Sequence, residues 1–194
     1  MAWAPDYVTS ADLKVYLRIG NTVDDAQVAL AVTAASRAVD KHCNRQFGQV
    51  AAPEARTYTA RWSSTRCRYV VDVDDVMTIT GLVVTGDAAI TDYTLKPSNA
   101  ALKGKPWTRL VLNAGGNGRE DGITVTARYG WTAVPVTVQE ATLLQASRFF
   151  KRRDAPFGVA GSPELGSELR LLAKVDPDVA VALGDYRRDA LLVA

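Results

Sequence analysis

The chain has 194 residues, of which 47% are hydrophobic and 23% are charged, a balance that excludes wholesale disorder and a fibrous repeat. Its net charge of +2, from 23 basic and 21 acidic residues, gives no reason to expect a nucleic-acid-binding or membrane-binding surface over the protein as a whole. A chain of this length buries a real core, so we expect one domain, or one domain with an inserted lobe.

No stretch of the sequence reaches the roughly 20 apolar residues that span a bilayer, so no membrane association is expected. The N-terminus reads MAWAPDY, without a basic leader and an apolar segment, and we therefore expect synthesis in a cytoplasm. The two cysteines, Cys43 and Cys67, are too few to indicate a disulfide framework.

The first predicted helix spans about residues 10–18. Thr9 and Asp12 stand at capping-box spacing before it, where each side chain can bond the other residue's backbone amide. Gly20 and Asn21 tolerate the left-handed conformation and are expected to end the helix.

A second, longer helix is predicted over about residues 23–44. Thr22 and Asp25 repeat the capping spacing at its start, and its alanine-rich sequence favours close packing against another helix. Apolar side chains recur at steps of three and four along one stripe, formed by Val28, Ala31, Val32, Ala35, Val39 and Cys43.

Between Pro53 and Gly130 the apolar period changes to two, which predicts antiparallel strands with one wet face. Residues 57–62 and 67–73 alternate on either side of a polar turn, and together they predict a hairpin. Further strands are expected around residues 77–85, 93–96, 109–112 and 123–129, and the glycine-rich segment 113–122 is expected to be a hairpin tip.

A third capping spacing, Thr137 with Glu140, predicts a helix over about residues 138–153 that ends in Lys151, Arg152 and Arg153. Ser162-Pro163 and Asp176-Pro177 predict short helices near 164–173 and 178–183, with Gly184 as a stop.

We therefore predict an α+β fold in which a helical core is made from N- and C-terminal segments and carries an inserted antiparallel β lobe. The predicted parts are residues 1–52 and 133–185 for the two halves of the core, 53–132 for the lobe and 186–194 for a C-terminal tail. The tail ends in apolar residues and is expected to bind a partner.

Candidate metal and catalytic groups are few. His42 is the only histidine, and neither a CxxC nor an HxxxH pair supplies further ligands beside His42 and Cys43, so packed or solvated helix residues are the favoured interpretation. Asp72, Asp74 and Asp75 could bind a cation through oxygen, but they lack calcium-loop spacing and are interpreted as a solvated strand end. No catalytic, cofactor or metal site is predicted, and the protein is not expected to be an enzyme.

Two motifs of the predicted lobe could bind phosphates. The glycine-rich run from Gly115 to Gly118 precedes neither Lys-Ser/Thr nor a helix and is interpreted as a turn. A nucleic-acid surface with stacking aromatics could be formed by Arg56, Arg61, Arg66 and Arg68 with Tyr58, Trp62 and Tyr69. Alternation places Tyr58 and Trp62 on the face opposite Arg61, however, which favours these aromatic residues as core.

The two ends of the chain resemble the head–tail connector (adaptor) family of tailed bacteriophages. The resemblance rests on the segment SADLKVYLRI from Ser10 to Ile19, the acidic break at Asp24-Asp25, the alanine-rich helix, and Arg45 with Phe47. Residues 135–153 are similar to the family's second long helix, through Ala141, Arg148, Phe149 and Arg152. About half of the chain is covered, and the strand-rich middle is longer than compact members need.

The resemblance implies a structural virion protein of the phage neck, a ring commonly of twelve subunits at the head–tail interface. Such a ring joins the portal protein to the stopper or tail-side neck protein and makes non-specific contact with the DNA that passes through its lumen. The candidate partner-interface residues are Arg148, Arg152, Arg153, Tyr186, Arg187, Arg188, Leu191, Leu192 and Val193. The alternative is a non-enzymatic module that binds a ligand or nucleic acid through the β lobe.

Overall fold

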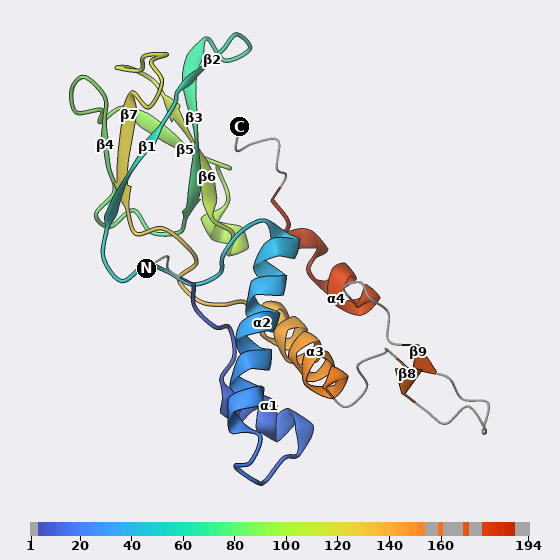
Figure 1. Cartoon of the computed structure of the whole chain (residues 1–194). Helices are drawn as coiled ribbons and strands as arrows, with labels where there is room; N and C mark the ends of the chain where they lie inside the picture. The colour runs from blue at the N-terminus through green and yellow to red at the C-terminus, as the bar shows by residue number, and fades with distance from the viewer. Residues whose placement is uncertain (1–3, 154–158, 161–168, 171–175, 189–194) are drawn as a thin grey trace. The chain divides into compact units, whose positions relative to one another are not determined.

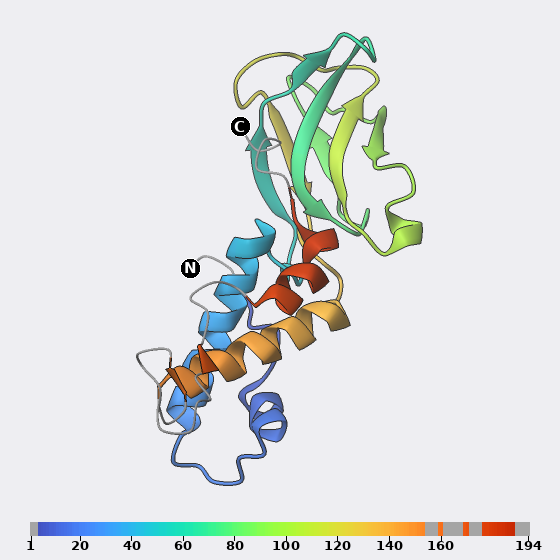
Figure 2. The same cartoon turned by 90° about the vertical axis from the view of Figure 1, so that its right-hand side faces the viewer.

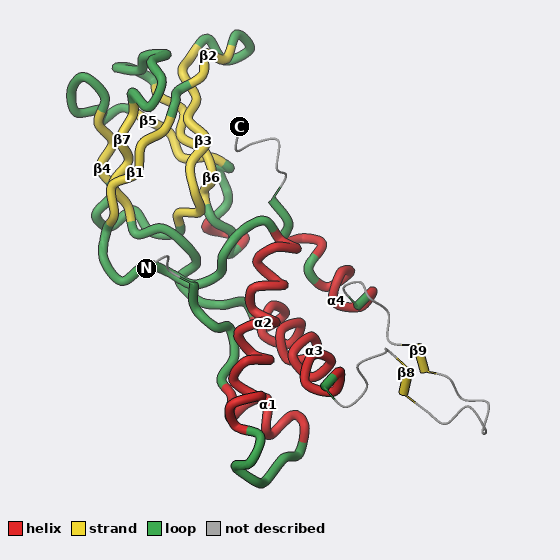
Figure 3. The backbone as a smooth tube through the Cα atoms, in the orientation of Figure 1, coloured by secondary structure: helices red, strands yellow, loops and turns green. Residues whose placement is uncertain are grey.

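The computed structural model describes residues 4–153, 159–160, 169–170 and 176–188. They divide into two compact units, one containing the chain up to Phe47 and again from Val134 onward, the other containing Gly48–Ala133. The α-helices described belong to the first unit, and the strands of the two larger sheets belong to the second (Figures 1 and 3). The fold is therefore α+β, as predicted.

The helical unit is built on two long helices, α2 (Asp25–Cys43) and α3 (Val136–Arg152), which pack against each other and cross at a wide angle in Figure 2. Its other elements are α1 (Ser10–Leu17), the short strands β8 (Val159–Ala160) and β9 (Leu169–Arg170), α4 (Pro177–Ala182) and the 3-10 turn η3 (Gly184–Tyr186). The predicted stripe of α2 is confirmed, because all six of its members are buried. The four from Val28 to Ala35 pack in one cluster with Leu13 of α1 and Ala146 of α3.

The capping box at the start of α1 is confirmed. Thr9 Oγ1 accepts a hydrogen bond from the Asp12 amide at 3.1 Å, and the Asp12 carboxylate accepts one from the Thr9 amide at 2.8 Å. The helix ends at Arg18, which adopts the left-handed conformation with φ 59°, and not at Gly20 as expected. Arg18 can do so because its amide and that of Ile19 still bond carbonyls of the last turn.

The other two predicted capping boxes are wrong. Asp24 is the N-cap of α2 and makes no side-chain capping bond, while Thr22 contributes only its carbonyl. The helix α3 starts earlier than expected, after Pro135, whose carbonyl accepts from the amides of the first turn. Thr137 therefore lies inside the helix, because the fixed φ of proline, here −60°, allows the chain to turn helical directly after it. At α4 the predicted cap is confirmed, with Asp176 accepting from the Asp178 amide.

The β unit contains two antiparallel sheets. Its strands are β1 (Glu54–Tyr58), β2 (Arg61–Ser63), β3 (Arg68–Val76), β4 (Val83–Thr85), β5 (Tyr93–Lys96), β6 (Trp107–Leu112) and β7 (Ile123–Ala127), with a 3-10 turn at η1 (Ala101–Lys103). One sheet has the order β2-β3-β6-β5, the other β1-β7-β4. The strand β7 buries every second residue, as its alternation predicted.

Three strand predictions need correction. The segment 57–62 is broken at buried Ala60, so that β1 pairs with β7 in one sheet and β2 with β3 in the other. Only Val83–Thr85 of the expected strand 77–85 is extended in a sheet. The segment 113–122 is no hairpin tip, because it joins β6 of one sheet to β7 of the other. The hairpin formed by β2 and β3 is confirmed, with Trp62 opposite Tyr69.

The two ends of the β unit meet at Gly130. Its amide donates to the Asp75 carbonyl at 2.6 Å, and the next amide, of Trp131, donates to the Gly48 carbonyl at 2.7 Å. Gly130 has φ +101°, and a Cβ built on it would lie 1.9 Å from the Gly48 oxygen. Only glycine fits this close approach of backbone segments.

Candidate interaction surfaces

A buried hydrogen-bond junction holds the N-terminal segment against the C-terminal half of α2. The Tyr7 hydroxyl donates to the Asp40 carboxylate and accepts from the Phe47 amide at 2.9 Å, while the Tyr7 amide donates to Ser36 Oγ at 3.2 Å. The rings of Tyr7 and Phe47 meet edge to face at 5.6 Å. Burial raises the pKa of Asp40, although the Tyr7 hydroxyl and Arg37 both act to lower it.

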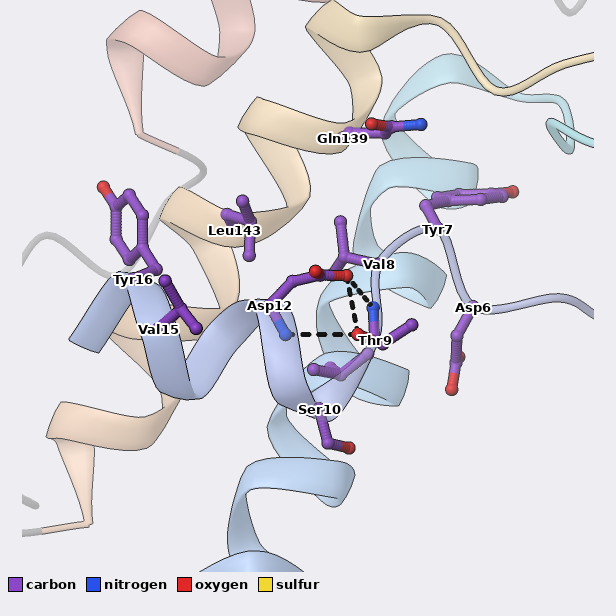
Figure 4. Close-up of a pocket in the computed structure, with 11 residues that line it drawn as sticks. Asp6, Tyr7, Val8, Thr9, Ser10, Asp12, Val15, Tyr16, Gln139 and Leu143 are labelled. Atoms are coloured by element: carbon purple, nitrogen blue, oxygen red, sulfur yellow. Dashed lines mark hydrogen bonds between the residues drawn. The ribbon is translucent and has the colours of Figure 1, made fainter. Parts of the chain in front are cut away.

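Beside this junction lies a groove of about 840 Å³, lined by the segment 6–10 and by residues of α1, α2 and α3. Val15 and Tyr16 of α1 and Leu143 of α3 border the same space in Figure 4. Val15 is 79% exposed and Tyr16 is 51% exposed. The carboxylates at the groove have internal partners, since Asp12 caps α1 and Asp6 accepts from Thr33 Oγ1 at 2.9 Å. The groove thus offers an accessible apolar contact surface.

The sequence contained one signal for this groove. Val15 and Tyr16 are large apolar residues, and Val15 lies off the Leu13–Leu17 face that α1 buries. The predicted interface did not include either of them, because a short helix with exposed apolar residues is common at protein surfaces.

The arginines predicted for the interface on α3 form contacts within the helical unit. Arg148 pairs with Asp176 at 3.1 Å, and Arg153 pairs with Asp24 at 2.5 Å while it lies over the Phe150 ring at 5.0 Å. Arg152 is half-buried at the end of α3. These ion pairs fasten α3 to α4 and to the start of α2, and the assignment of the three arginines to a partner interface stays a prediction.

The described part of the predicted tail lies against the end of α2. Tyr186 packs its ring edge-on to Phe47 at 5.8 Å, and the Arg188 amide donates to the Cys43 carbonyl at 2.8 Å. Arg187 is exposed. The remaining predicted interface residues, Leu191, Leu192 and Val193, and the predicted helix at 164–173 lie outside the described residues, apart from β9.

His42 and Cys43 are packed helix residues, in agreement with the sequence interpretation. Burial raises the pKa of the Cys43 thiol to about 11, and it lowers the pKa of His42, which Arg187 lowers further. Both cysteines are free thiols, with Cys43 buried and Cys67 exposed. Within the described ranges no group of three or more His, Cys, Asp or Glu side chains could hold a metal ion.

The three carboxylates of β3 are not a solvated strand end. Asp75 is 5% exposed and accepts from Trp131 Nε1 at 2.8 Å. Asp74 accepts from Arg56 at 2.7 Å and from the Tyr58 hydroxyl at 3.0 Å, and burial raises the pKa of Tyr58 well above its ordinary value. Asp72 accepts from Arg109 at 2.7 Å. Each carboxylate is therefore used to stabilise the lobe.

The expectation that Trp62 belongs to the core is wrong. Its side chain is 58% exposed and meets the Tyr69 ring at 5.1 Å in an edge-to-face arrangement. The strand β2 has only three residues and pairs with β3 alone at the edge of its sheet, so alternation there does not turn one face toward a core. Arg61, Arg66 and Arg68 on the same hairpin are all exposed.

The chain is similar in fold to several solved structures, although its sequence matches neither a family model nor a curated protein. Among the helices described, none has the length and apolar character needed to cross a membrane.

Three similar chains come from gene transfer agent (GTA) particles. One is in the neck of an empty particle solved with C6 symmetry, at 16% identity and a TM-score of 0.57, covering 97% of this chain and 94% of that one. A second is in the virion of a native particle, at 18% identity and a TM-score of 0.54, with the same coverage of both chains. A third is in the neck of a native particle with C12 symmetry, at 18% identity and a TM-score of 0.53, covering 91% of this chain and 97% of that one. At these identities the likeness establishes the fold alone.

Proposed function

We propose that this protein is a non-enzymatic structural subunit of the neck of a phage-like particle. The observation that carries the proposal is the shared fold, which extends over 97% of this chain and 94% of a chain from a GTA neck. The resemblance of residues 10–47 and 135–153 to the connector family, based on sequence features, supports the same role independently.

The neck subunit works as a member of a ring. Twelve copies surround a lumen through which DNA passes, and the ring joins the portal protein on one side to the stopper or tail-side protein on the other. Support for a ring comes from the C6 and C12 symmetry of the structures that contain the similar chains. The protein is accordingly a component of the virion, made in the cytoplasm of the host.

In this role the chain needs surfaces that bind proteins. The groove beside α1 is such a surface, because burying Val15 and Tyr16 under a neighbouring subunit contributes about 1.5–3 kcal/mol for each large apolar side chain that becomes fully buried. The helical unit and the β lobe then act as a core and an insert, and the tail beyond residue 185 binds a further protein.

Deletion of the gene tests the neck role directly. We expect DNA-filled heads and separate tails, visible by electron microscopy, and recovery of joined particles when the gene is supplied in trans. Joined, infectious particles without the protein would contradict the proposal.

The groove is tested by paired substitutions in the complementing gene. Tyr16→Asp combined with Val15→Asp places two charges where apolar contact is expected, and joined particles should fall by at least about tenfold, since one lost contact of about 1.4 kcal/mol already changes an equilibrium tenfold. Val181→Asp is the matched control, because Val181 is 82% exposed and lies on α4, outside the groove. Equal loss in both variants would remove the groove from the interface.

A further inference from the structure

The tip of the β2–β3 hairpin, residues 61–69, has a concentration of positive charge. It includes Arg61, Arg66 and Arg68, and no acidic residue occurs between Ala60 and Val71. All three arginines are exposed. Within the described residues Arg61 and Arg66 form no ion pair, and Arg68 donates to the neutral side chain of Asn113.

Three arginines elsewhere in the lobe do form ion pairs. Arg56 pairs with Asp74 and Glu54, Arg109 with Asp72, and Arg119 with Asp87. These three arginines are therefore neutralised by carboxylates that lie close by. The positive charge that remains at the tip is available to an anionic partner.

The strand register sets how these groups are arranged. Ser63 lies opposite Arg68, and Arg61 lies opposite Val70, so Arg61 and Arg68 are diagonal neighbours on one face. Arg66 lies in the turn next to the hydroxyl residues Ser64 and Thr65. Trp62 and Tyr69 are opposite each other and occupy the other face.

The tip is held in place by the crossover segment between β6 and β7. Gly116 lies so close to Tyr69 that a Cβ on it would be 2.7 Å from the Tyr69 side chain. Asn113 binds Arg68 with its carbonyl oxygen and donates its amide to Asp92 at 2.7 Å. A supported hairpin positions its arginines at a lower entropic cost than a free loop would.

We propose that the hairpin tip binds the phosphate backbone of duplex DNA. The arginines contact phosphates, and the hydroxyls of the turn donate to phosphate oxygens. The inference rests on the proposed function for the source of the duplex, which is the DNA that passes through the neck. Binding of this kind is weak and independent of sequence, which suits DNA that must move.

DNA fits the tip better than an acidic protein does. The cores of protein–protein interfaces are depleted in charged residues, whereas three of the residues from 61 to 69 are arginines and three more are serine or threonine. Interfaces with DNA are more polar and more positively charged. A single exposed tryptophan does not provide the apolar centre of a protein interface.

The test is fluorescence anisotropy of a labelled duplex of about 30 base pairs with purified protein, over salt from about 50 to about 200 mM. If the tip makes three phosphate contacts, a plot of the logarithm of the binding constant against the logarithm of the salt concentration should have a slope of about −3. The triple variant Arg61→Gln, Arg66→Gln, Arg68→Gln should bind at least about tenfold more weakly at the lowest salt, with a slope near zero.

The matched control is Lys41→Gln, Lys103→Gln, Lys151→Gln, which removes the same charge from exposed positions elsewhere. It should bind as the natural protein does. Unchanged binding by the tip variant, or equal loss in the control, would overturn the proposal. Competition by poly-L-glutamate as effective as competition by duplex of equal charge would also overturn it, in favour of an acidic protein surface.

Cys67 gives a second measurement on the unsubstituted protein. It is exposed in the hairpin turn, while Cys43 is buried with a raised pKa, so a maleimide reacts with Cys67 in the native state. Saturating duplex should slow this reaction at least about threefold, and an unchanged rate would contradict the proposal. A natural protein that joins heads to tails but does not bind duplex removes only this inference, whereas joined particles after gene deletion remove the neck role.

Discussion

Substitution of Tyr7 by phenylalanine tests whether the buried junction of the helical unit determines its stability. The change keeps the ring against Phe47 and removes the hydroxyl that donates to Asp40 and accepts from the Phe47 amide. A hydrogen bond to a charged group contributes about 1.5–3 kcal/mol and one between neutral groups about 1 kcal/mol. We therefore expect the free energy of unfolding to fall by about 2–4 kcal/mol near neutral pH.

The cost of Tyr7→Phe should depend on pH. Burial already raises the pKa of Asp40 above 3.8, and loss of the Tyr7 hydroxyl removes a group that lowers it. Between the unfolded and the folded pKa the native state then binds more protons than the unfolded state, so stability falls as the pH rises through that window. The substitution should accordingly cost less at about pH 4 than at neutral pH, because protonation removes the buried charge.

The measurement is urea unfolding followed by circular dichroism at a helical wavelength, at both pH values. Tyr16→Phe is the control, since Tyr16 is 51% exposed and its hydroxyl makes no hydrogen bond within the described residues. Its cost should stay within about 0.5 kcal/mol. Equal costs for the two substitutions, or a Tyr7→Phe cost that is the same at both pH values, would refute the reasoning.

Two further predictions concern other parts of the chain. Gly130→Ala should destabilise the β unit by at least about 3 kcal/mol, because its Cβ would collide with the Gly48 carbonyl. Gly104→Ala, also at positive φ but in open space, should cost about 1 kcal/mol. Tryptophan fluorescence during urea unfolding measures the difference, and similar costs would be inconsistent with the close approach. The single histidine signal in proton NMR should titrate with a midpoint below pH 6.5, because burial and Arg187 lower the pKa of His42. The unfolded state then binds more protons, so His42 should add stability above pH 6.5 that is lost as the pH falls through its folded pKa. A midpoint at or above pH 6.5 would contradict this prediction.

The helical part of the fold could be predicted because its signals are local. The buried stripe of α2 follows from residues three and four apart, and the capping box at Thr9 joins neighbours in sequence. The same capping spacing at Thr22 and Thr137 was misleading, since spacing alone does not say whether the preceding backbone is in position for a cap. At α3 the preceding Pro135 decided the outcome.

Apart from the β2–β3 hairpin, the pairing of strands could not be predicted, because alternation shows that a strand has two faces and does not identify its partner. Nothing local distinguishes the segment 113–122 as a crossover from a hairpin turn, and nothing in residues 57–62 indicates that β1 and β2 join different sheets. The arginines predicted for an interface show the same limit. Arg148 finds Asp176 only after α3 and α4 have packed, whereas the exposure of Trp62 depends on the edge position of β2.

The meeting of chain segments at Gly130 has a consequence for how this protein can change over evolutionary time. Gln49 bridges Gly130, and β1 pairs with β7, so the β unit begins and ends at adjacent points of its own sheet. Pairing within the insert already holds its two ends together. The helical unit therefore pays little additional loop-closure entropy for carrying it. Residues 48–133 thus form a cassette that can be lengthened, shortened or exchanged while the hydrogen bonds around Tyr7 remain the same.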